Sequence, residues 1–366
     1  MNPLPSSPTS CAYRIGVLTF HRCINYGSYW QARSLLKGLE LLGFKAELLD
    51  HRSPRTDRAE WRVALEPTLP TSVRKQDREL YECKVRKFSQ LFCDLPMSPR
   101  FDLDHPEELP KYDAIVVGSD EVWNLRHPWF GEKPAFFGGG LPTDRLISYA
   151  ASFGNFSSWE GIGSPWTDLL ARFDHISVRD ENSWWMLKNA LGIEVPIVLD
   201  PALQWAIDPD GTWKGPSSPF ALVYGHNFSQ EFVSKARDWS RRRNLPLLSI
   251  GYRNDWADDS WLDADPHDFA HAFARSRAVL TNFFHGCIFS LRNQRPFACE
   301  KSPYRSIKIS GLVELLETES RLVSPSDPMD GLLDEPIPDA TLDRIEALRR
   351  ASTDYLAQAL QFVYVC

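Results

Sequence analysis

Three observations predict that this chain forms an α/β protein with two doubly wound domains facing a cleft. Its 366 residues exceed the length of one ordinary domain. Short apolar runs alternate with helical stretches in two successive series, which is typical of parallel sheets covered by helices. A stretch rich in Pro, Gly, Trp and Ser, residues 200–218, separates the two series. We therefore expect an N-terminal domain over residues 1–202, a C-terminal domain over 203–335 and a final helix, 336–366, packed across both.

The first series opens with an apolar run of strand type, a polar turn and a helical stretch. Strands are expected over residues 13–20, 45–49, 112–117, 146–151, 175–179 and 196–199, and helices over 29–42, 73–92 and 180–191. Gly43 follows the first helical stretch, at the position where a glycine commonly ends a helix. The strand–helix–strand opening indicates parallel pairing, because a crossover helix returns the second strand in the same direction as the first.

The second series repeats this alternation from about residue 219 onward. Strands are expected over residues 220–225, 246–251, 278–282 and 296–299, and helices over 230–243, 267–275, 284–293, 304–317 and 340–363. The last helix is long and amphipathic, so either domain could receive its apolar face.

Composition excludes several classes of protein. With 41 basic and 48 acidic residues the net charge is −7, which provides no general positive field for nucleic acid. No apolar run approaches the roughly 20 residues that span a bilayer, and the N-terminus lacks the apolar core of a signal peptide. The seven Cys residues form no CxxC pair and no zinc-type spacing. We therefore expect free thiols, no bound metal and a cytoplasmic location.

Nucleotide-binding signatures are missing as well. Neither G-x-G-x-x-G nor the P-loop pattern is present, so dinucleotide binding and P-loop NTPase activity lack their usual sequence basis. An anionic ligand would instead need a local cluster of basic side chains. The 13 Trp residues either stack on sugars or fill the core.

Residues directly after strands are the main candidates for a binding site, because ligands of open parallel sheets bind beyond the carboxyl ends of the strands. Asn25, Tyr26 and Gly27 follow the first strand and open a helix, whose free N–H groups would suit an anion or a hydroxyl. The alternative is a plain turn with Asn25 as the helix cap. Ser119 and Asp120 follow the third strand. Asp120 would act as a general base or orient a hydroxyl; otherwise these two residues cap a short helix.

Charged and titratable residues follow the later strands. Arg179 could clamp a carboxylate or phosphate, or pair with a neighbouring acid. His285 opens a helix, where a bound phosphate would favour its protonated form and suit it to proton transfer; a buried core role is the alternative. Cys287 is either a nucleophile or a packing residue. Arg305 and Lys308 begin the next helix and provide either the required positive cluster or two solvated charges.

Six segments, taken in order, resemble the motifs of the polysaccharide pyruvyl transferase family. They are Val17–Arg22 with Asn25–Gly27, Gly118–Asn124, Ser148–Gly154, Ser177–Asp180, Leu199–Pro201 and Thr281–Gly286. The resemblance implies two Rossmann-like domains in a GT-B-like arrangement, with the acceptor on the N-terminal side and the donor on the C-terminal side. It also implies transfer of pyruvate from phosphoenolpyruvate onto sugar hydroxyls to form a ketal.

The resemblance further implies roles for individual residues. His285 corresponds to the family's general acid, and Asp120 to the acid of its Gly-Ser-Asp motif. Substrate contacts are expected from Arg179, Arg305, Lys308, Asn25, Tyr26, Gly27, Ser119, Trp123, Asn282 and Gly286. No cofactor is expected, since phosphoenolpyruvate is itself the donor substrate. The acceptor would be a sugar or a lipid-linked oligosaccharide met at a membrane surface, and the sequence leaves a homo-oligomer open.

The chain departs from the family pattern near two of these motifs. Glu121 stands where Gln is usual, Phe283 stands where Ser is usual, and Phe283 and Phe284 replace an Arg. Binding of the phosphate would then fall to the basic residues already named. Two other classes remain as alternatives: a group transferase with a nucleotide-linked donor, including one that tailors a small natural product, and a catalytically inactive binding subunit.

Overall fold

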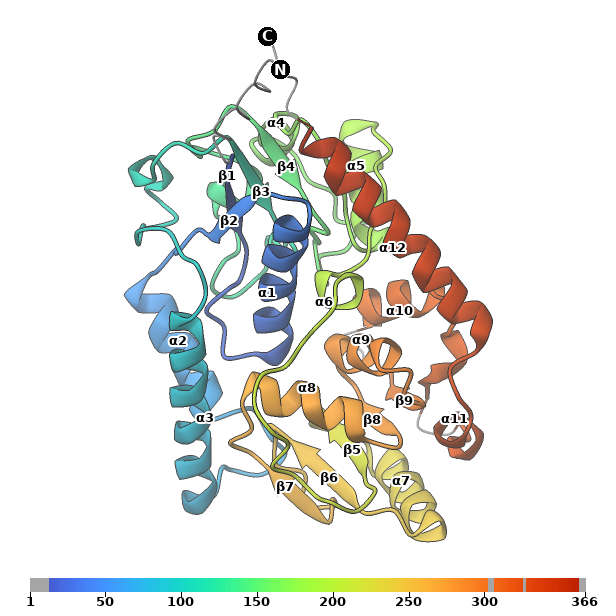
Figure 1. The fold of residues 1–366 in the computed structure, drawn as a ribbon. Coiled ribbons are helices and arrows are strands. Elements are labelled where there is room, and N and C mark those ends of the chain that lie inside the picture. The colour runs from blue at the N-terminus through green and yellow to red at the C-terminus, as the bar shows by residue number, and fades with distance from the viewer. Residues whose placement is uncertain (1–12, 302–305, 325–326, 362–366) are drawn as a thin grey trace, which may run out of the picture.

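The protein contains two parallel β-sheets, each covered by helices, one above the other in Figure 1. The computed structural model describes residues 13–301, 306–324 and 327–361. The first sheet ends at residue 148 and the second begins at residue 221, so the expected boundary near residue 202 falls between them. The predicted fold class, two doubly wound α/β domains in a GT-B-like arrangement, is confirmed.

The first sheet has four parallel strands in the order β2-β1-β3-β4. These are β1 (Arg14–Leu18), β2 (Lys45–Leu48), β3 (Ala114–Val117) and β4 (Leu146–Ser148). The run β3 is apolar throughout and fully buried, as expected for a central strand covered on both faces. The strands predicted over 175–179 and 196–199 are wrong. Those segments form only isolated bridges, and Pro196 has no N–H to extend a ladder.

Helices of the N-terminal half surround this sheet and extend below it (Figure 1). They are α1 (Tyr26–Leu41), α2 (Pro54–Leu65), α3 (Lys75–Cys93), α4 (Trp166–Leu170), α5 (Glu181–Leu191) and α6 (Pro201–Gln204), with the 3-10 turns η1 (Pro106–Glu108) and η2 (Pro134–Phe137). Helix α1 begins three residues earlier than expected, because the Asn25 side chain accepts hydrogen bonds from the first free N–H groups. Gly43 has φ of 89°, the left-handed conformation that ends this helix.

The second sheet has six parallel strands in the order β10-β9-β8-β5-β6-β7. They are β5 (Ala221–Tyr224), β6 (Leu247–Ile250), β7 (Asp259–Trp261), β8 (Val279–Thr281), β9 (Phe297–Glu300) and β10 (Leu322–Val323). The helices are α7 (Gln230–Arg243), α8 (Pro266–Arg275), α9 (Phe284–Arg292), α10 (Ser306–Leu315), α11 (Asp330–Asp334) and α12 (Asp339–Ala359), with the turn η3 (Glu319–Arg321). The two edge strands were not predicted, because β10 has only two residues and β7 lacks a buried apolar run.

Helix α3 belongs to the N-terminal half of the chain but packs against the second domain. Lys84 donates to the carbonyl of Gly251 at 3.0 Å, and Arg253 pairs with Asp77 at 2.5 Å. The two domains are therefore joined through a helix that precedes the linker by more than a hundred residues.

The beginning of α1 and the last helix also connect the domains. The Tyr26 ring stacks on Phe269 at 4.3 Å, and its hydroxyl donates to the carbonyl of Ala264 at 2.8 Å. Helix α12 runs along one side of both domains in Figure 1. Its Tyr355 hydroxyl donates to Ser148 in the first sheet at 2.8 Å, while Arg344 pairs with Glu317 beyond α10 at 2.8 Å. These contacts hold the two halves face to face.

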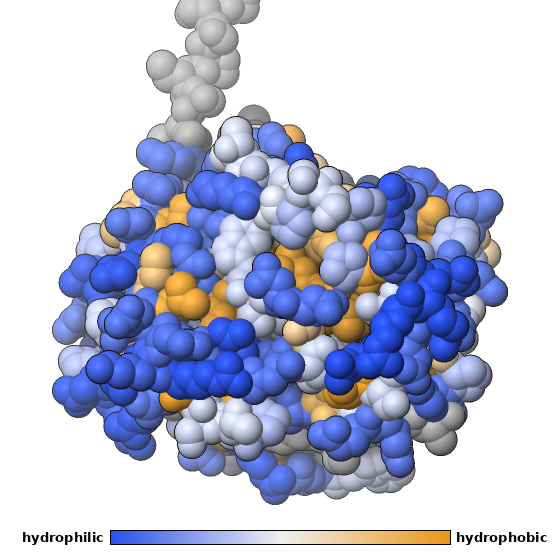
Figure 2. All heavy atoms as spheres, turned by 90° about the horizontal axis from the view of Figure 1, so that it is seen from below, coloured by the Kyte–Doolittle hydropathy of each residue, from blue (hydrophilic) through white to orange (hydrophobic). Residues whose placement is uncertain are grey.

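The outer surface is largely hydrophilic. Figure 2, which views the molecule from below, shows charged and polar residues over most of that face, with apolar residues gathered in small areas. No helix in the described part of the chain is long and apolar enough to cross a bilayer. The cysteines in the described part of the chain are free thiols, as expected; they are Cys23, Cys83, Cys93, Cys287 and Cys299.

The contact of Tyr26 with the second domain predicts a measurable loss of stability. In Tyr26→Phe the carbonyl of Ala264 loses its buried donor, so the free energy of unfolding should fall by about 1 to 3 kcal/mol. Urea unfolding followed by tryptophan fluorescence measures the change. Leu41→Ala, at a side chain that is 65% exposed in the same helix, is the control and should cost about 0.5 kcal/mol or less. Equal effects of the two variants would contradict this role of Tyr26.

Candidate active site

A cavity of about 710 Å³ lies where the carboxyl ends of the two sheets face each other. In the first sheet the connections diverge between β1 and β3, and in the second between β5 and β8. Parallel sheets bind ligands at such points, because the loops there leave the sheet in opposite directions. The wall is formed by loops following these four strands and by parts of α2, α3 and α10. It includes Phe20, Cys23, Ile24, Asn25, Ser28, Glu60, Lys84, Asp120, Glu121, Arg179, His226, Asn227, Phe284, His285 and Lys308.

Arg179 lies at the centre of this wall, buried between two carboxylates. Its guanidinium is 3.0 Å from Asp200 and 3.3 Å from Asp120, and its side chain is 1% exposed. The ring of Phe284 lies 4.7 Å from the guanidinium carbon, within cation–π distance. The Arg179 Nε has no hydrogen-bond partner among the described residues. The predicted pairing with neighbouring acids is therefore present, and the anchored guanidinium has its Nε left without a partner.

Asp120 is held as a carboxylate. One oxygen faces Arg179, and the other accepts a hydrogen bond from the Ser28 hydroxyl at 3.0 Å. Burial raises the pKa of the Asp120 carboxyl, but the neighbouring Arg179, His285 and Lys308 together outweigh burial and bring the pKa to about 2. Such a carboxylate is a weak proton acceptor near neutral pH. Its contacts with Arg179 and Ser28 instead suit it to holding the guanidinium in place.

His285 occupies the first turn of α9 and faces the same carboxylate cluster. Its Nε2 lies 3.7 Å from Asp200, too far for a hydrogen bond, and has no hydrogen-bond partner in the described chain. Burial lowers the pKa of the imidazole, and the charge of Arg179 lowers it further, while Asp200 and Asp120 oppose these effects. The ring is therefore neutral at pH 7 and has a nitrogen available for an incoming group.

Gly27 is the residue that allows His285 to take this position. A Cβ on Gly27 would lie 2.0 Å from the Nδ1 of His285, well inside contact distance. Gly27 opens α1 in the first domain, whereas His285 opens α9 in the second. The two helix starts can approach this closely only with a hydrogen atom in place of a side chain.

Lys308 and Glu121 form an ion pair across the cleft. Lys308, on α10, lies 2.5 Å from Glu121, which follows β3, and the two side chains are 16% and 17% exposed. Burial raises the pKa of Glu121, but the charge of Lys308 outweighs it and the net effect is a lowered pKa. Arg305, expected beside Lys308, lies outside the described residues. Glu121, the departure from the family pattern, thus neutralises one of the cations that an anionic donor would require.

The other residues expected to contact substrate make hydrogen bonds or packing contacts within the protein. Asn25 lines the cavity and uses its side-chain oxygen to cap α1, which is the alternative role predicted for it. Ser119 is fully buried and donates to Gln31 at 2.9 Å. Trp123 is 0% exposed and donates to the carbonyl of Phe136 at 2.8 Å, which places it in the core of the first domain.

Three further residues lie behind the cavity wall. Tyr26 serves the domain contact described above. Asn282 donates to the carbonyl of His226 at 2.8 Å, while its own side-chain oxygen is buried without a partner among the described residues. Gly286 packs on Thr281, where a Cβ would lie 2.0 Å from the hydroxyl oxygen. Asp120, Arg179, Lys308 and His285 are therefore brought together, whereas Ser119, Trp123 and Gly286 support them from behind.

Sequence reasoning missed several members of the cavity. Asp200 lies beside the cavity: one of its oxygens accepts from the N–H of Ala202 at the start of α6, and the other binds Arg179. Ser28 follows directly on the predicted turn and could have been included with it. Glu60 and Lys84 carry no strand-end signal, because they come from the middle of α2 and α3.

A cleft between two doubly wound domains, with an acid–base cluster and cations on its wall, is typical of an enzyme of GT-B-like architecture. The sequence model of the polysaccharide pyruvyl transferase family matches residues 25–300, and the chain belongs to this family. No curated protein sequence matches it.

Several solved structures are similar in overall trace. Escherichia coli heptosyltransferase WaaC with ADP has 10% identity and a TM-score of 0.40, over 92% of this chain and 99% of that one. The UDP-GlcNAc 2-epimerase from Methanocaldococcus jannaschii has 10% identity and a TM-score of 0.42, over 91% of each chain. An alpha-glucosyltransferase in complex with UDP and a 13-mer DNA has 12% identity and a TM-score of 0.47, over 95% of each chain.

The contact between Gly27 and His285 can be tested by a double-mutant cycle. Gly27→Ala should lower the free energy of unfolding by about 1 to 3 kcal/mol, because the added methyl overlaps the imidazole. In the His285→Ala background the same change should cost less, giving a coupling energy of about 1 kcal/mol or more. Urea unfolding of the four proteins provides the values. Gly163→Ala, where a Cβ meets open space, is the control; strictly additive effects would show that the ring does not press on Gly27.

Proposed function

We propose that this protein transfers the pyruvyl group of phosphoenolpyruvate onto the hydroxyls of a sugar or polysaccharide precursor, forming a ketal. The observation that carries the proposal is the convergence of three family motifs on one cavity. Asp120, Arg179 and His285 are separated by 59 to 165 positions in the sequence, yet they surround the same carboxylate cluster. Family membership supplies the reaction class, and the cavity supplies a place where a small anion and a proton-transfer group can meet.

The donor would bind where α9 begins. Helix α9 has no side-chain cap at its N-terminus, so its first N–H groups remain available to a phosphate. Lys308 would turn from Glu121 to the phosphate, and the free Nε of Arg179 would bind the carboxylate of the donor. Exchanging Glu121 for the phosphate would keep Lys308 neutralised, which suits a buried site.

The reaction requires a proton at the methylene carbon of phosphoenolpyruvate. In the proposed step His285, protonated beside the bound phosphate, gives its Nε2 proton to this carbon, and the positive character that develops at C2 is captured by an acceptor hydroxyl. The hydroxyl loses its proton to a base, the C2–phosphate oxygen bond breaks, and inorganic phosphate leaves. A second hydroxyl of the acceptor then attacks C2 and closes the ketal, and its proton passes to the departing phosphate. Domain contacts around the cavity would exclude water from the reactive centre.

Asp120 does not fit the role of the base in this scheme. Its carboxylate is bound by Arg179 and Ser28, and its pKa of about 2 leaves it little affinity for a proton. We assign it to orienting Arg179, together with Asp200.

Replacing His285 should separate chemistry from folding. We expect His285→Ala to reduce phosphate release from phosphoenolpyruvate, measured with an acceptor present, by about 10²- to 10⁴-fold, because the proton donor is lost. Thermal-shift measurements should show that phosphoenolpyruvate still stabilises the variant. Activity within a few-fold of the wild type would remove His285 from the mechanism. Stabilisation of the wild-type protein by nucleotide sugars alone would favour a nucleotide-linked donor instead.

The lowered pKa of His285 predicts a pH dependence of donor binding. The ring is neutral in the free protein at pH 7, and a bound phosphate raises its pKa, so binding takes up a proton. The affinity should therefore weaken as pH rises above neutrality, by up to about tenfold per pH unit. Calorimetry in two buffers with different ionisation enthalpies counts the protons. His285→Gln is the control for protons taken up by the donor itself, and an unchanged proton count in it would contradict the assignment.

A further inference from the structure

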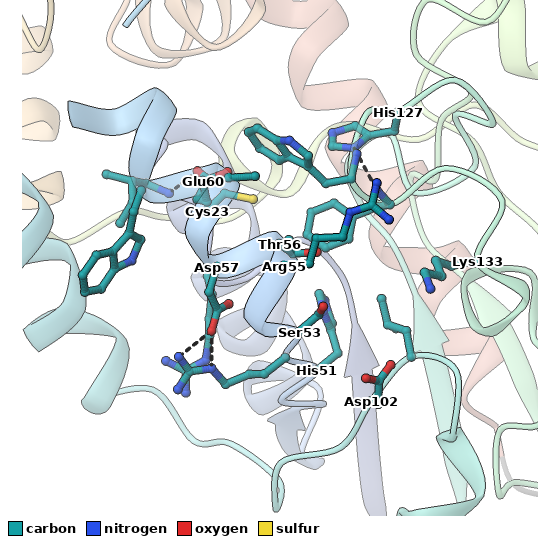
Figure 3. A pocket seen from close by; sticks show the side chains of 18 of the residues that line it. Cys23, His51, Ser53, Arg55, Thr56, Asp57, Glu60, Asp102, His127 and Lys133 are labelled. Carbon is teal, nitrogen blue, oxygen red and sulfur yellow. Dashed lines mark hydrogen bonds and ion pairs between the residues drawn. The ribbon is translucent and has the colours of Figure 1, made fainter. Parts of the chain in front are cut away.

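A second, larger cavity adjoins the proposed donor site. It has a volume of about 790 Å³ and is lined only by residues between 22 and 133, all in the N-terminal half of the chain. Six residues border both cavities: Cys23, Ile24, Glu60, His127, Pro128 and Trp129. Figure 3 shows Cys23 and Glu60 together at one end of the larger cavity, with His51 and Ser53 toward the other. A ligand in the larger cavity would thus have one end at the donor site.

Glu60 is the acid on this shared wall. One carboxylate oxygen accepts a hydrogen bond from the N–H of Ile24 at 2.7 Å, which fixes the side chain against the loop after β1. The other oxygen, Oε2, is buried and has no hydrogen-bond partner among the residues described. A buried carboxylate oxygen without a donor is costly to maintain. A ligand hydroxyl placed at the junction of the cavities would satisfy it.

The larger cavity has balanced charge. Arg22 pairs with Asp50 at 2.5 Å, and Arg52 pairs with Asp57 at 2.7 Å. Lys133, across the cavity in Figure 3, pairs with Asp104 at 2.7 Å. These pairs present many donors and acceptors but little net charge, so they match the hydroxyls of a neutral glycan better than a phosphate.

Aromatic side chains complete this match. Trp61 is 51% exposed although it lines the cavity, and Trp129 lies on the shared wall. An exposed Trp beside such a cavity offers a flat apolar surface with a polar edge, which suits the mixed faces of a sugar ring.

We propose that the larger cavity binds a neutral glycan acceptor and that Glu60 takes the proton from its attacking hydroxyl. This inference rests on the proposed pyruvyl transfer. The O–H bond of the acceptor breaks as its oxygen forms a bond to C2 of the donor, and the proton passes to Oε2 of Glu60. His285 supplies a different proton, to the methylene carbon. Glu60 thereby fills the role that Asp120 cannot.

The electrostatic surroundings of Glu60 agree with this role. Burial raises the pKa of Glu60 to about 7, the N–H of Ile24 and the charge of Lys84 oppose this rise, and Asp57 adds to it. Cys23 and His127 on the shared wall are the other titratable groups beside it. A carboxylate whose pKa is close to the working pH is a far better base than one with a pKa of about 2. Turnover should therefore fall as pH drops below about 7, because Glu60 becomes protonated.

Binding of the acceptor can be tested without the donor. We expect the full-length protein to bind neutral oligosaccharides on a glycan array, and Trp61→Ala to reduce that signal at least tenfold. Trp159→Ala, at a Trp that is 96% exposed and lies outside both cavities, is the matched control and should leave it unchanged. Absence of glycan binding by the wild type, or equal binding by Trp61→Ala, would overturn the glycan site whatever the donor proves to be.

The role of Glu60 is then tested with the glycan that binds best. Glu60→Gln should keep its affinity for glycan and phosphoenolpyruvate within about twofold, lower phosphate release at least 100-fold, and lose the fall in rate below pH 7. Glu79→Gln, an exposed acid on α3, should behave as the wild type. If the wild type turns over and Glu60→Gln releases phosphate at the same rate, the role of Glu60 as the base is overturned and the donor assignment stands. A glycan-bound wild type without any turnover would overturn the pyruvyl transfer and, with it, the role of Glu60.

Discussion

The structure of the cavity depends on the burial of one positive charge. A guanidinium whose side chain is 1% exposed needs polar partners within the protein, because its desolvation is otherwise costly. Arg179 finds them in Asp120, after β3, and in Asp200, at the start of α6. These segments are distant in sequence, so satisfying Arg179 fixes several loops of the first domain at once. Phe284 then brings the second domain over the guanidinium, and His285 beside it reaches the same carboxylates.

Close contact between helix starts completes this arrangement. The absence of a side chain at Gly27 lets α9 approach α1, while Tyr26, one residue earlier, extends into the second domain and stacks on Phe269. Three neighbouring residues of one turn thus have different roles: Asn25 caps the helix, Tyr26 joins the domains and Gly27 leaves room for the imidazole. Packing and catalytic geometry are determined by the same few residues, so a change in this turn affects both.

Sequence alone predicted the fold and several residues that line the candidate cavity, but not which of its charges are paired. Helix α7 has the same bounds as expected, 230–243, because its amphipathic pattern and caps agree. Strand-end reasoning selected Asp120 and His285, since parallel strands bring such residues to one edge. Arg179 was selected on a strand that is not formed, and only isolated bridges of Val178 bring it to the same edge. Trp123 shares a motif with Asp120, yet side chains within one loop point in different directions, and it faces the core. Glu60 gave no signal, because only the packing of α2 beside the cleft brings it near the loop after β1.

Pairing of the cations also shows what the proposed anionic donor would meet in an acidic protein. The net charge of −7 is irrelevant at the cavity, where Arg179 and Lys308 are each held by a carboxylate from the first domain. Glu121, which stands where the family has Gln, holds Lys308 across the cleft. An amide there could accept a hydrogen bond from the ammonium but could not neutralise it. In the proposed mechanism a donor anion would therefore have to displace a charged partner, so Glu121 would weaken donor binding while it keeps Lys308 ordered at the cavity wall.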